Sequence, residues 1–337
     1  MREEVKELWK LCFPEDSNEF VELYFLSRYK DDITSVIKID GKIVSALQRI
    51  PYPMTYKGYI IQTSYISGAC THPCNRSLGL MTRLLKEAHI KMYNDGILLS
   101  TLIPANENLV GFYKKSKYIV GFKQKEECFT YNETNQTKNL SFIKLESAEK
   151  RISDIYHFIY EQQSKKSSCI LHTFEDMKVI VADHKLSGGE IWAGFSNKDD
   201  ICSIAFIINE EDKLLIKEIV SLNYNIKEET VNFLLKHYNI NSAYMPSLCG
   251  MIRIVNSLEL LKLYAHNKDI DYLIEVYGDD AISENNGMYL LSEGTCIKLK
   301  DEPSKGFFGI EHLRLSISEL AEFLFRNESP YMSLMLN

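Results

Sequence analysis

The stretch ISGACTHPCNRSLGLMTRLL, residues 66–85, decides how the sequence is interpreted. An apolar run of strand type ends at Thr71, a short polar turn follows at 74–77, and an amphipathic helix pattern comes next. Arg76 and Gly79 stand three residues apart at this junction. A strand that leads into a helix N-terminus through a turn rich in free backbone N–H groups suits an anion. The stretch therefore predicts an anion-binding turn.

The anion-binding turn consists of Arg76, Ser77, Leu78, Gly79, Leu80 and Met81. Gly79 lets the backbone approach a phosphate where a Cβ would intrude, and Arg76 adds positive charge at the rim. Other phosphate loops are excluded, because the sequence contains neither G-x-x-x-x-G-K-[ST] nor G-x-G-x-x-G. By itself, the R-x-x-G spacing arises often by chance.

Composition places the chain among soluble globular proteins. Its 337 residues favour two or three domains, and 45% of them are hydrophobic and 25% charged. No apolar run approaches the roughly 20 residues of a membrane span, and the charged start MREEVKELWK does not resemble a signal peptide. We therefore expect a cytoplasmic protein without a membrane partner. The net charge of −7 argues against nucleic acid as the main partner.

The eight cysteines are scattered along the chain, as in a reduced cytosolic protein. Cys70 and Cys74 flank His72, which raises the question of a metal site. No second Cys/His pair with ligand spacing accompanies them, and the alternation in SYISGAC makes Cys70 an ordinary strand residue. The sequence therefore predicts no metal.

The periodicity of the first part of the chain predicts the element order α-α-β-β-β-α-β-α-β. Asp40-Gly41 is a strong hairpin signal, and the helix after Gly79 should end at Gly96. This helix has an apolar stripe at spacings of three and four, formed by Met81, Leu84, Leu85, Ala88 and Met92.

The rest of the chain predicts two further domains. Residues 132–139 are polar and lack periodicity, so we place a linker there. A first domain then spans 1–131. A second, 132–249, repeats the helix and strand pattern of the first without an Arg-x-x-Gly turn, and a third spans 250–337. The predicted fold class is α/β with mixed sheets.

With this element order, HPCNRSLGLM resembles the GNAT acetyltransferases, whose pattern is [QR]-x-x-G-x-[GA]. LSTLIPANENLVGFYKKSKY and the late blocks ENNGMYLL and LSISELAEFLF are similar to the Eis-like (enhanced intracellular survival) branch. The resemblance implies tandem GNAT folds, the second degenerate, and a sterol-carrier-like C-terminal domain. Met81 stands where the general family has Gly or Ala, and Ser77 where Gly is common.

The resemblance also implies a site for acetyl-CoA as cosubstrate. Backbone N–H groups from Ser77 through Thr82 would hold its pyrophosphate. The strand segment Ala69, Cys70 and Thr71 would bind the pantetheine arm, which Asn108, expected before the next helix, would also contact. Tyr113 lies where the family places its general acid. From the residues alone, Phe112 and Tyr113 are more typical of core aromatics in a short helix than of a catalytic site, and the resemblance reverses this preference.

The base that takes the proton of the amine is less well defined. The resemblance implies that the α-carboxylate of Asn337 reaches the active site, and the apolar tail SPYMSLMLN is expected to pack rather than fray. Internal candidates are His72, His89, Glu107 and Glu126. We expect His89 to be solvated, because it lies between Lys86 and Lys91 on its helix.

Three functions are compatible with the sequence. The first is an N-acetyltransferase in which a primary amine of a cationic acceptor, small molecule or peptide, attacks the acetyl-CoA thioester directly. The second is a non-catalytic acyl-CoA or lipid-binding protein, and the third is an interaction module that uses the GNAT folds as a scaffold. The identity of the acceptor and the oligomeric state, including a homo-oligomer, stay open.

Overall fold

The computed structural model describes residues 1–132, 140–146, 148–266, 270–300 and 310–336. The chain forms two compact units, each built from several segments. Unit 1 comprises Met1–Ser17, Arg28–Phe122 and Cys249–Pro330, and unit 2 comprises Asn18–Ser27, Lys123–Leu248 and Tyr331–Asn337. Unit 1 thus joins parts of the predicted first and third domains, whose boundaries stay predictions.

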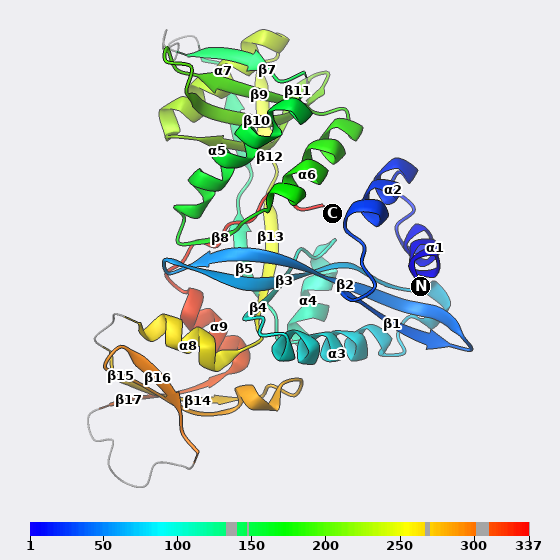
Figure 1. The fold of residues 1–337 in the computed structure, drawn as a ribbon, viewed down its shortest axis with the longest axis vertical. Coiled ribbons are helices and arrows are strands. Elements are labelled where there is room, and N and C mark those ends of the chain that lie inside the picture. Colours follow the sequence, from blue (N-terminus) through cyan, green and yellow to red (C-terminus); the bar gives the residue numbers. More distant parts are fainter. Residues whose placement is uncertain (133–139, 147, 267–269, 301–309, 337) are drawn as a thin grey trace. The chain divides into compact units, whose positions relative to one another are not determined.

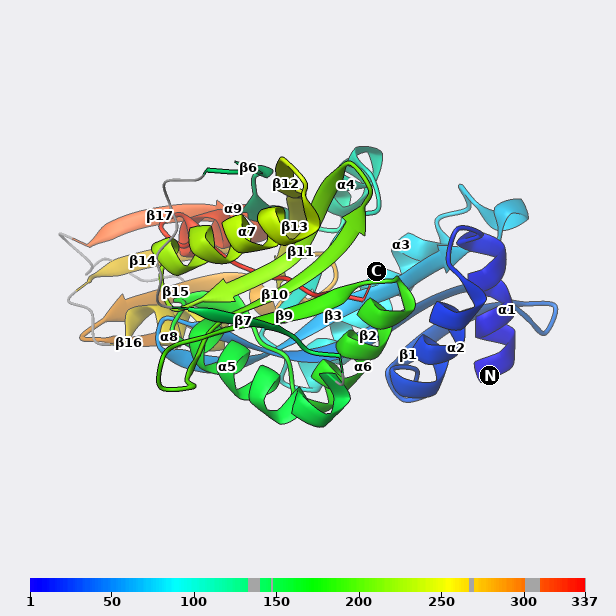
Figure 2. The ribbon, with the colours of Figure 1, turned by 90° about the horizontal axis from the view of Figure 1, so that it is seen from above.

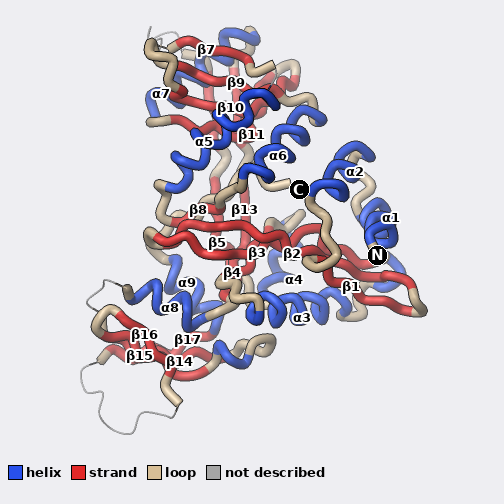
Figure 3. The backbone as a smooth tube through the Cα atoms, in the orientation of Figure 1, coloured by secondary structure: helices blue, strands red, loops and turns tan. Residues whose placement is uncertain are grey.

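The first part of the chain has the predicted element order, but its second helix, α2 (Asn18–Ser27), belongs to unit 2. Figures 1 and 3 show the strands and helices of unit 1. Its elements are α1 (Arg2–Cys12), β1 (Thr34–Ile39), β2 (Lys42–Tyr56), β3 (Tyr59–Thr71), η1 (Pro73–Asn75), α3 (Leu80–Asn94), β4 (Leu99–Leu102), α4 (Glu107–Lys115) and β5 (Ile119–Gln124). The β1–β2 turn has positive φ at both Asp40 and Gly41, as the hairpin signal predicts. Helix α3 ends before Gly96, which has φ +74°.

The apolar stripe of α3 packs against the sheet. Leu84, Leu85, Ala88 and Met92 are fully buried and share a core cluster with Leu47 of β2. The stripe was therefore predicted correctly, and it fixes α3 on the sheet directly after the anion-binding turn.

An unpredicted strand completes this sheet. The strand order is β1-β2-β3-β4-β13-β5, so β13 (Leu248–Ile254) lies between β4 and β5 (Figure 1). It runs antiparallel to β4, with Met251 opposite Leu102 and Ile254 opposite Leu99. The segment that follows the second predicted domain therefore contributes to the first sheet.

The remainder of unit 1 is a smaller α/β layer. It contains α8 (Ser257–Ala265), β14 (Tyr272–Tyr277), η4 (Ser283–Asn285), β15 (Gly287–Ser292), β16 (Thr295–Lys298), β17 (Glu311–Ser316) and α9 (Ile317–Phe325), with strand order β16-β15-β14-β17. Ser316 caps α9 in a capping box with Glu319.

A buried ion pair joins β13 to this layer. Nη2 of Arg253 donates to Oδ1 of Asp279 at 2.8 Å, and both side chains are completely buried. Asp279 also accepts from the backbone N–H groups of Ala281 and Ile282 and from Nδ2 of Asn285. Nε and Nη1 of Arg253 have no hydrogen-bond partner among the described residues, where Asp279 is the counterion of its guanidinium group.

Unit 2 is a second sheet with helices on both faces. Its elements are α2 (Asn18–Ser27), β6 (Glu127–Thr130), β7 (Ser141–Lys144), η3 (Ala148–Arg151), α5 (Ile152–Ser164), β8 (Ser168–Ile170), α6 (Phe174–Leu186), β9 (Glu190–Phe195), β10 (Ile201–Glu210), β11 (Lys213–Ser221), α7 (Tyr224–Tyr238) and β12 (Ser242–Met245). The strand order is β6-β12-β11-β10-β9-β7. Figure 2 shows α7 on one face of this sheet and α5 and α6 on the other. Successive strand residues face opposite clusters: Ile204 and Phe206 pack with α5 and α6, and Ala205 and Ile207 with α7.

The C-terminal tail packs within unit 2, as its apolar composition predicted. Met332 and Leu336 are buried. Two backbone hydrogen bonds join Tyr331 to β8. The N–H of Tyr331 donates to the carbonyl oxygen of Ser168, and the carbonyl oxygen of Tyr331 accepts from the N–H of Ile170. The predicted α/β fold class with mixed sheets is confirmed. In the described part of the chain, no helix is long and apolar enough to cross a membrane.

The Arg253–Asp279 pair generates a stability prediction. Asp279→Ala leaves a buried guanidinium without its counterion, so we expect the free energy of unfolding to fall by about 3–5 kcal/mol. Chemical unfolding followed by circular dichroism measures this change. The neighbouring Asp280 is exposed and lies 3.9 Å from Lys117, so Asp280→Ala is the matched control and should change stability by less than about 0.5 kcal/mol. Equal effects of the two variants contradict the assignment.

Candidate functional site

The turn between β3 and α3 has the backbone shape of an anion site. Ser77 has φ +65° and Gly79 has φ +73°, so two left-handed residues stand two positions apart just before α3. Such conformations orient successive N–H groups toward one side of the chain. Ser77 adopts the left-handed region in which Gly is most comfortable, which explains why Gly is common at this position in the family that the sequence resembles.

The N-terminus of α3 is open. Gly79 is the N-cap and supplies no side-chain cap, so the N–H groups of Leu80, Met81 and Thr82 have no intrahelical acceptor. The first intrahelical donor is Arg83, whose N–H lies 3.0 Å from the carbonyl oxygen of Gly79. A Cβ built on Gly79 would find no atom within 4 Å. An anion can therefore reach these donors without displacing protein atoms.

Arg76 is held beside the turn. It is exposed, and its Nε donates to the carbonyl oxygen of Thr71 at 3.2 Å. Ahead of it, Nδ1 of His72 accepts from the N–H of Cys74 at 3.2 Å and caps η1. His72 thus has a structural role in shaping the turn, and its role as a base stays a prediction.

Strand β3 offers a backbone edge next to the turn. It pairs with β4 in parallel over Thr63, Ser64 and Tyr65, and within the described part of the chain this pairing ends at Tyr65. Ala69, Cys70 and Thr71 lie in this end of β3, and on the other side Cys70 pairs with Ala46 and Thr71 with Ser45 of β2. An extended ligand with amide groups can add to such an edge.

A glycine that the sequence analysis missed shapes this edge. Gly68 has φ +58°, and a Cβ there would lie 2.2 Å from Cζ3 of Trp9 on α1. The β2–β3 register shifts at this point, which marks a β-bulge. Gly68 therefore allows α1 to approach β3 and helps to orient the residues that follow.

Tyr113 lies on α4 with its ring packed and its hydroxyl available. Its side chain is 7% exposed, and its ring makes edge contacts with Phe112 and Tyr118 at centroid distances of 5.2 and 5.8 Å. Among the described residues, its hydroxyl makes no hydrogen bond. Burial raises the pKa of Tyr113 to about 12, so the phenol keeps its proton at neutral pH. The ring thus has the packing role that the sequence left open.

The expectation that His89 is solvated is wrong. His89 is 1% exposed, because the apolar stripe rotates this face of α3 into the sheet. Its Nε2 lies 3.0 Å from the hydroxyl of Tyr118, which in turn lies 2.6 Å from Oγ of Ser100. Desolvation, followed by the charge of Arg253, lowers the pKa of His89 well below its usual range. His89 is therefore a neutral core residue with no access to an acceptor in solvent.

Other predicted residues lie as follows. Asn108 is inside the first turn of α4 and exposed, rather than before the helix; Asn106 is the N-cap, and its Oδ1 accepts from the N–H of Leu109. Glu107 and Glu126 are exposed. Asn337 lies outside the described residues, so its role stays a prediction.

Cys12, which the sequence analysis did not single out, adjoins the site. Its Sγ lies 3.5 Å from the same Thr71 carbonyl oxygen that Arg76 binds. A hydrogen bond from Cys70 and the charge of Arg76 lower the pKa of Cys12 to about 7, against the effect of burial. Cys12 and Cys70 are far apart in the sequence, so spacing gives no signal for this pair. Among the described residues, no group of three or more His, Cys, Asp or Glu could hold a metal ion.

Comparison with known proteins identifies the first domain. Residues 2–121 match the family described as an acetyltransferase (GNAT) domain. The chain therefore contains a GNAT acetyltransferase domain, and the prediction that the protein is an acyltransferase is confirmed. Enzymes of this family use acyl-CoA. No curated protein matches the chain.

Solved structures resemble the chain over nearly its full length. A probable N-acyltransferase from Enterococcus faecalis is 15% identical, with a TM-score of 0.79 over 98% of this chain and 96% of its own. A GCN5-related N-acetyltransferase from Anabaena variabilis is 16% identical, with a TM-score of 0.76 over 98% and 96%. Eis1 from Mycobacterium abscessus is 9% identical, with a TM-score of 0.73 over 96% and 87%. These likenesses support the GNAT fold and the similarity to Eis, and they do not test the sterol-carrier-like prediction.

The lowered pKa of Cys12 predicts selective alkylation. The thiolate is the reactive form, so the rate of reaction with iodoacetamide should rise as pH increases and reach half its maximum near pH 7. For an ordinary thiol, the alkylation rate reaches half its maximum at about pH 8.5. Mass spectrometry of the Cys12 peptide measures the rate, and the exposed Cys249 controls for reagent access. A midpoint above pH 8 for Cys12 contradicts the prediction.

Proposed function

We propose that the protein transfers an acetyl group from acetyl-CoA to a primary amine of a cationic small molecule or peptide. The observation that carries this proposal is the open N-terminus of α3, where Ser77 and Gly79 orient unpaired N–H groups beside Arg76. An anion with several oxygens, such as a pyrophosphate, matches these converging donors. The N–H groups of residues 77–82 would bind it.

The departure at Met81 is compatible with this role. Leu80 and Met81 are partly buried and pack against the core cluster of α3 and the sheet. The bulk of Met81 therefore contributes to the core, and its backbone N–H stays one of the three without an intrahelical acceptor. Leu78, by contrast, is 63% exposed and leaves the turn open.

The C-terminal end of β3 is proposed to align the thioester. Backbone groups of Ala69, Cys70 and Thr71 would pair with the pantetheine amides, as an added strand pairs with a sheet edge. A backbone N–H directed at the acetyl oxygen then stabilises the oxyanion that forms when the amine attacks. In other acyl-transfer enzymes, one such donor lowers the activation free energy by about 2.7–4 kcal/mol.

Tyr113 is proposed to assist the leaving group. The amine nitrogen forms a bond to the acetyl carbon, the C–S bond breaks, and the sulfur leaves as a thiolate. A phenol with a pKa near 12 is a weaker acid than a thiol with a pKa near about 8.5, so complete proton transfer costs about 5 kcal/mol. Tyr113 therefore acts chiefly as a hydrogen-bond donor to the developing thiolate.

The base stays a prediction, with the Asn337 carboxylate, His72, Glu107 and Glu126 as candidates. Turnover separates the enzyme from the alternative of a non-catalytic acyl-CoA or lipid-binding protein. Acetyl-CoA is incubated with a polyamine, an aminoglycoside or a lysine-containing peptide, and free thiol is measured. Release that depends on the amine supports the enzyme, whereas CoA binding without release with any of the three supports the alternative.

The anion-binding turn is tested at Gly79. Gly79→Glu places a carboxylate among the proposed phosphate donors, so CoA affinity should fall at least 100-fold. Gly79→Ala is the matched control: it has the same strain at φ +73° and finds the same open space, but adds no charge. Calorimetry should give one CoA per wild-type chain, because unit 2 has no Arg-x-x-Gly turn. If Gly79→Glu binds CoA like the control, the turn is not the cofactor site.

Tyr113 is tested by removing its hydroxyl. Tyr113→Phe keeps the ring contacts with Phe112 and Tyr118, and kcat should fall on the order of 10²-fold with little change in CoA affinity. Tyr93→Phe, near the C-terminal end of α3 and packed against the core cluster that contains Tyr113, controls for the loss of a tyrosine hydroxyl. An unchanged kcat for Tyr113→Phe leaves Tyr113 with a packing role alone.

A further inference from the structure

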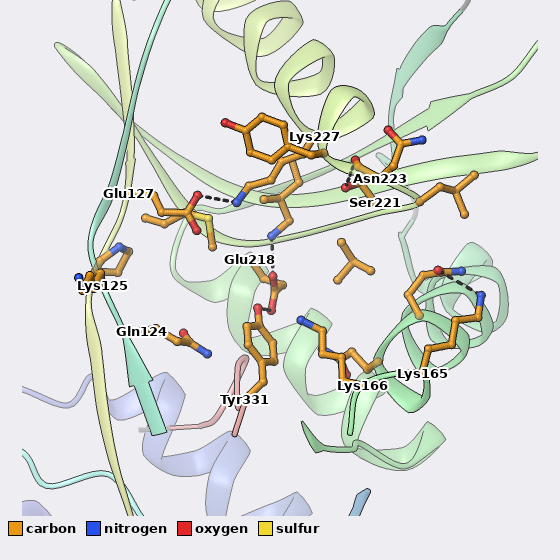
Figure 4. A pocket seen from close by; sticks show the side chains of 18 residues that line it. Gln124, Lys125, Glu127, Lys165, Lys166, Glu218, Ser221, Asn223, Lys227 and Tyr331 are labelled. Carbon is orange, nitrogen blue, oxygen red and sulfur yellow. Dashed lines mark hydrogen bonds and ion pairs between the residues drawn. The ribbon is translucent and has the colours of Figure 1, made fainter. Parts of the chain in front are cut away.

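Unit 2 contains a pocket to which no function has been assigned. Its volume is about 490 Å³, and it lies where β11 ends and α7 begins (Figure 4). Both signs of charge line it, on Lys125, Lys166, Lys227, Glu127 and Glu218, together with Tyr331 of the C-terminal tail. Pockets of this size commonly hold small molecules.

Glu218 is the charged group at the base of the pocket, with 1% of its surface exposed. Its Oε1 accepts from the backbone N–H of Ile219 at 2.8 Å, and its Oε2 accepts from the hydroxyl of Tyr331 at 2.6 Å. Both oxygens accept hydrogen bonds, as those of an ionised carboxylate do. In the parts of the chain that the structure describes, no cation pairs with Glu218, although buried charges in proteins are normally paired. A ligand cation would supply the missing partner.

The lysines come from separate elements around the pocket (Figure 4). Lys125 precedes β6, Lys166 follows α5, and Lys227 lies on α7. Nζ of Lys166 lies 3.6 Å from the centre of the Tyr331 ring, and Nζ of Lys227 lies 2.6 Å from Oε2 of Glu127. With Lys165, four lysines line the pocket against two carboxylates. Lys165 also pairs with Glu161 outside the lining, at 2.9 Å, so the lysines exceed the nearby carboxylates by one, in a protein whose net charge is −7. This excess of lysines suits an anionic group.

We propose that this pocket binds a small zwitterion of the amino-acid class. Its ammonium group would contact Glu218, and its carboxylate would lie among the lysines. A pure anion would bring its charge toward Glu218, and a pure cation would bring its charge toward the lysines. A ligand with both charges satisfies both sides of the pocket, which explains why the lining is mixed.

Binding here would also stabilise the C-terminal tail. Tyr331 donates to Glu218, and the following residues are held by Gln124, whose Nε2 donates to the carbonyl of Met332, and by His172, whose Nε2 lies 2.8 Å from the carbonyl oxygen of Ser333. A ligand that binds the ordered tail more tightly than the open tail must favour the ordered form. Hydrogen exchange of the amides of 331–333 should therefore slow when the zwitterion is bound.

The first experiment identifies the charge pattern of the ligand. The full chain, without acetyl-CoA, is screened against the twenty standard amino acids by thermal shift. The best one is titrated by calorimetry beside its decarboxylated amine and its deaminated acid. We expect the amino acid to bind and each analogue to bind at least tenfold more weakly. No amino acid binding below 10 mM, or an analogue that binds equally well, overturns the proposal.

The second experiment locates the site. Glu218→Gln keeps the shape and the hydrogen-bonding capacity but removes the charge, so affinity for the amino acid should fall tenfold or more. Glu210→Gln is the matched control, because Glu210 also accepts from a tyrosine hydroxyl, that of Tyr244 at 2.9 Å, outside the pocket. Unchanged affinity in Glu218→Gln overturns the proposal.

Lysine variants keep the test decisive if Glu218→Gln does not fold. Lys166→Gln should weaken amino-acid binding at least fivefold. Lys178→Gln should not, although Lys178 likewise lies over an aromatic ring, 4.7 Å from the centre of Phe174. Equal affinities of the two variants contradict a role for the pocket lysines. None of these measurements depends on acetyl transfer, so the outcome is independent of the proposed enzymatic function.

Discussion

The insertion of β13 between β4 and β5 is the constraint on which unit 1 depends. Helix α4 connects β4 to β5, so the width of β13 sets the distance that this connection spans. Arg253 of β13 is fully buried and paired with Asp279, which fixes the strand to the smaller α/β layer. The charge of Arg253 also helps to lower the pKa of His89, whose Nε2 lies 3.0 Å from the hydroxyl of Tyr118. The ring of Tyr118 in turn contacts the ring of Tyr113. A segment remote in the sequence therefore defines the surroundings of the proposed leaving-group donor.

The anion-binding turn, in contrast, is a local structure. Its donors arise from the uncapped first turn of α3, and its shape arises from two left-handed residues, Ser77 and Gly79. Packing of α3 through its apolar stripe holds the helix axis, so these N–H groups are oriented before any ligand arrives. A preoriented set of donors binds an anion without the cost of ordering a loop.

The features that sequence analysis predicted are those that short spacings encode. The Asp40-Gly41 hairpin, the stripe of α3 and the glycine at the α3 N-cap each depend on residues within a few positions of one another. The features it missed depend on contacts between distant segments. The β13 insertion, the burial of His89, the approach of Trp9 to Gly68 and the meeting of Cys12 with Arg76 have no local signature. For His89, the flanking lysines led to the prediction of an exposed side chain. The residue is buried because it lies on the face of the helix that packs against the sheet.

Two strand–helix junctions of the chain, from β3 to α3 and from β11 to α7, differ in whether a side chain caps the helix start. In unit 1, α3 begins at Gly79 without a side-chain cap, so its N–H groups remain for an anion. In unit 2, Oδ1 of Asn223 accepts from the N–H of Ile226 at 3.0 Å, so the start of α7 is capped by the protein itself. A capped helix start has one fewer backbone donor for a phosphate, and the charges at this junction come from side chains instead. Side chains can supply both signs, whereas a helix N-terminus supplies only positive charge. The loss of the open turn in unit 2 is therefore compatible with a change in the kind of ligand rather than with the loss of binding.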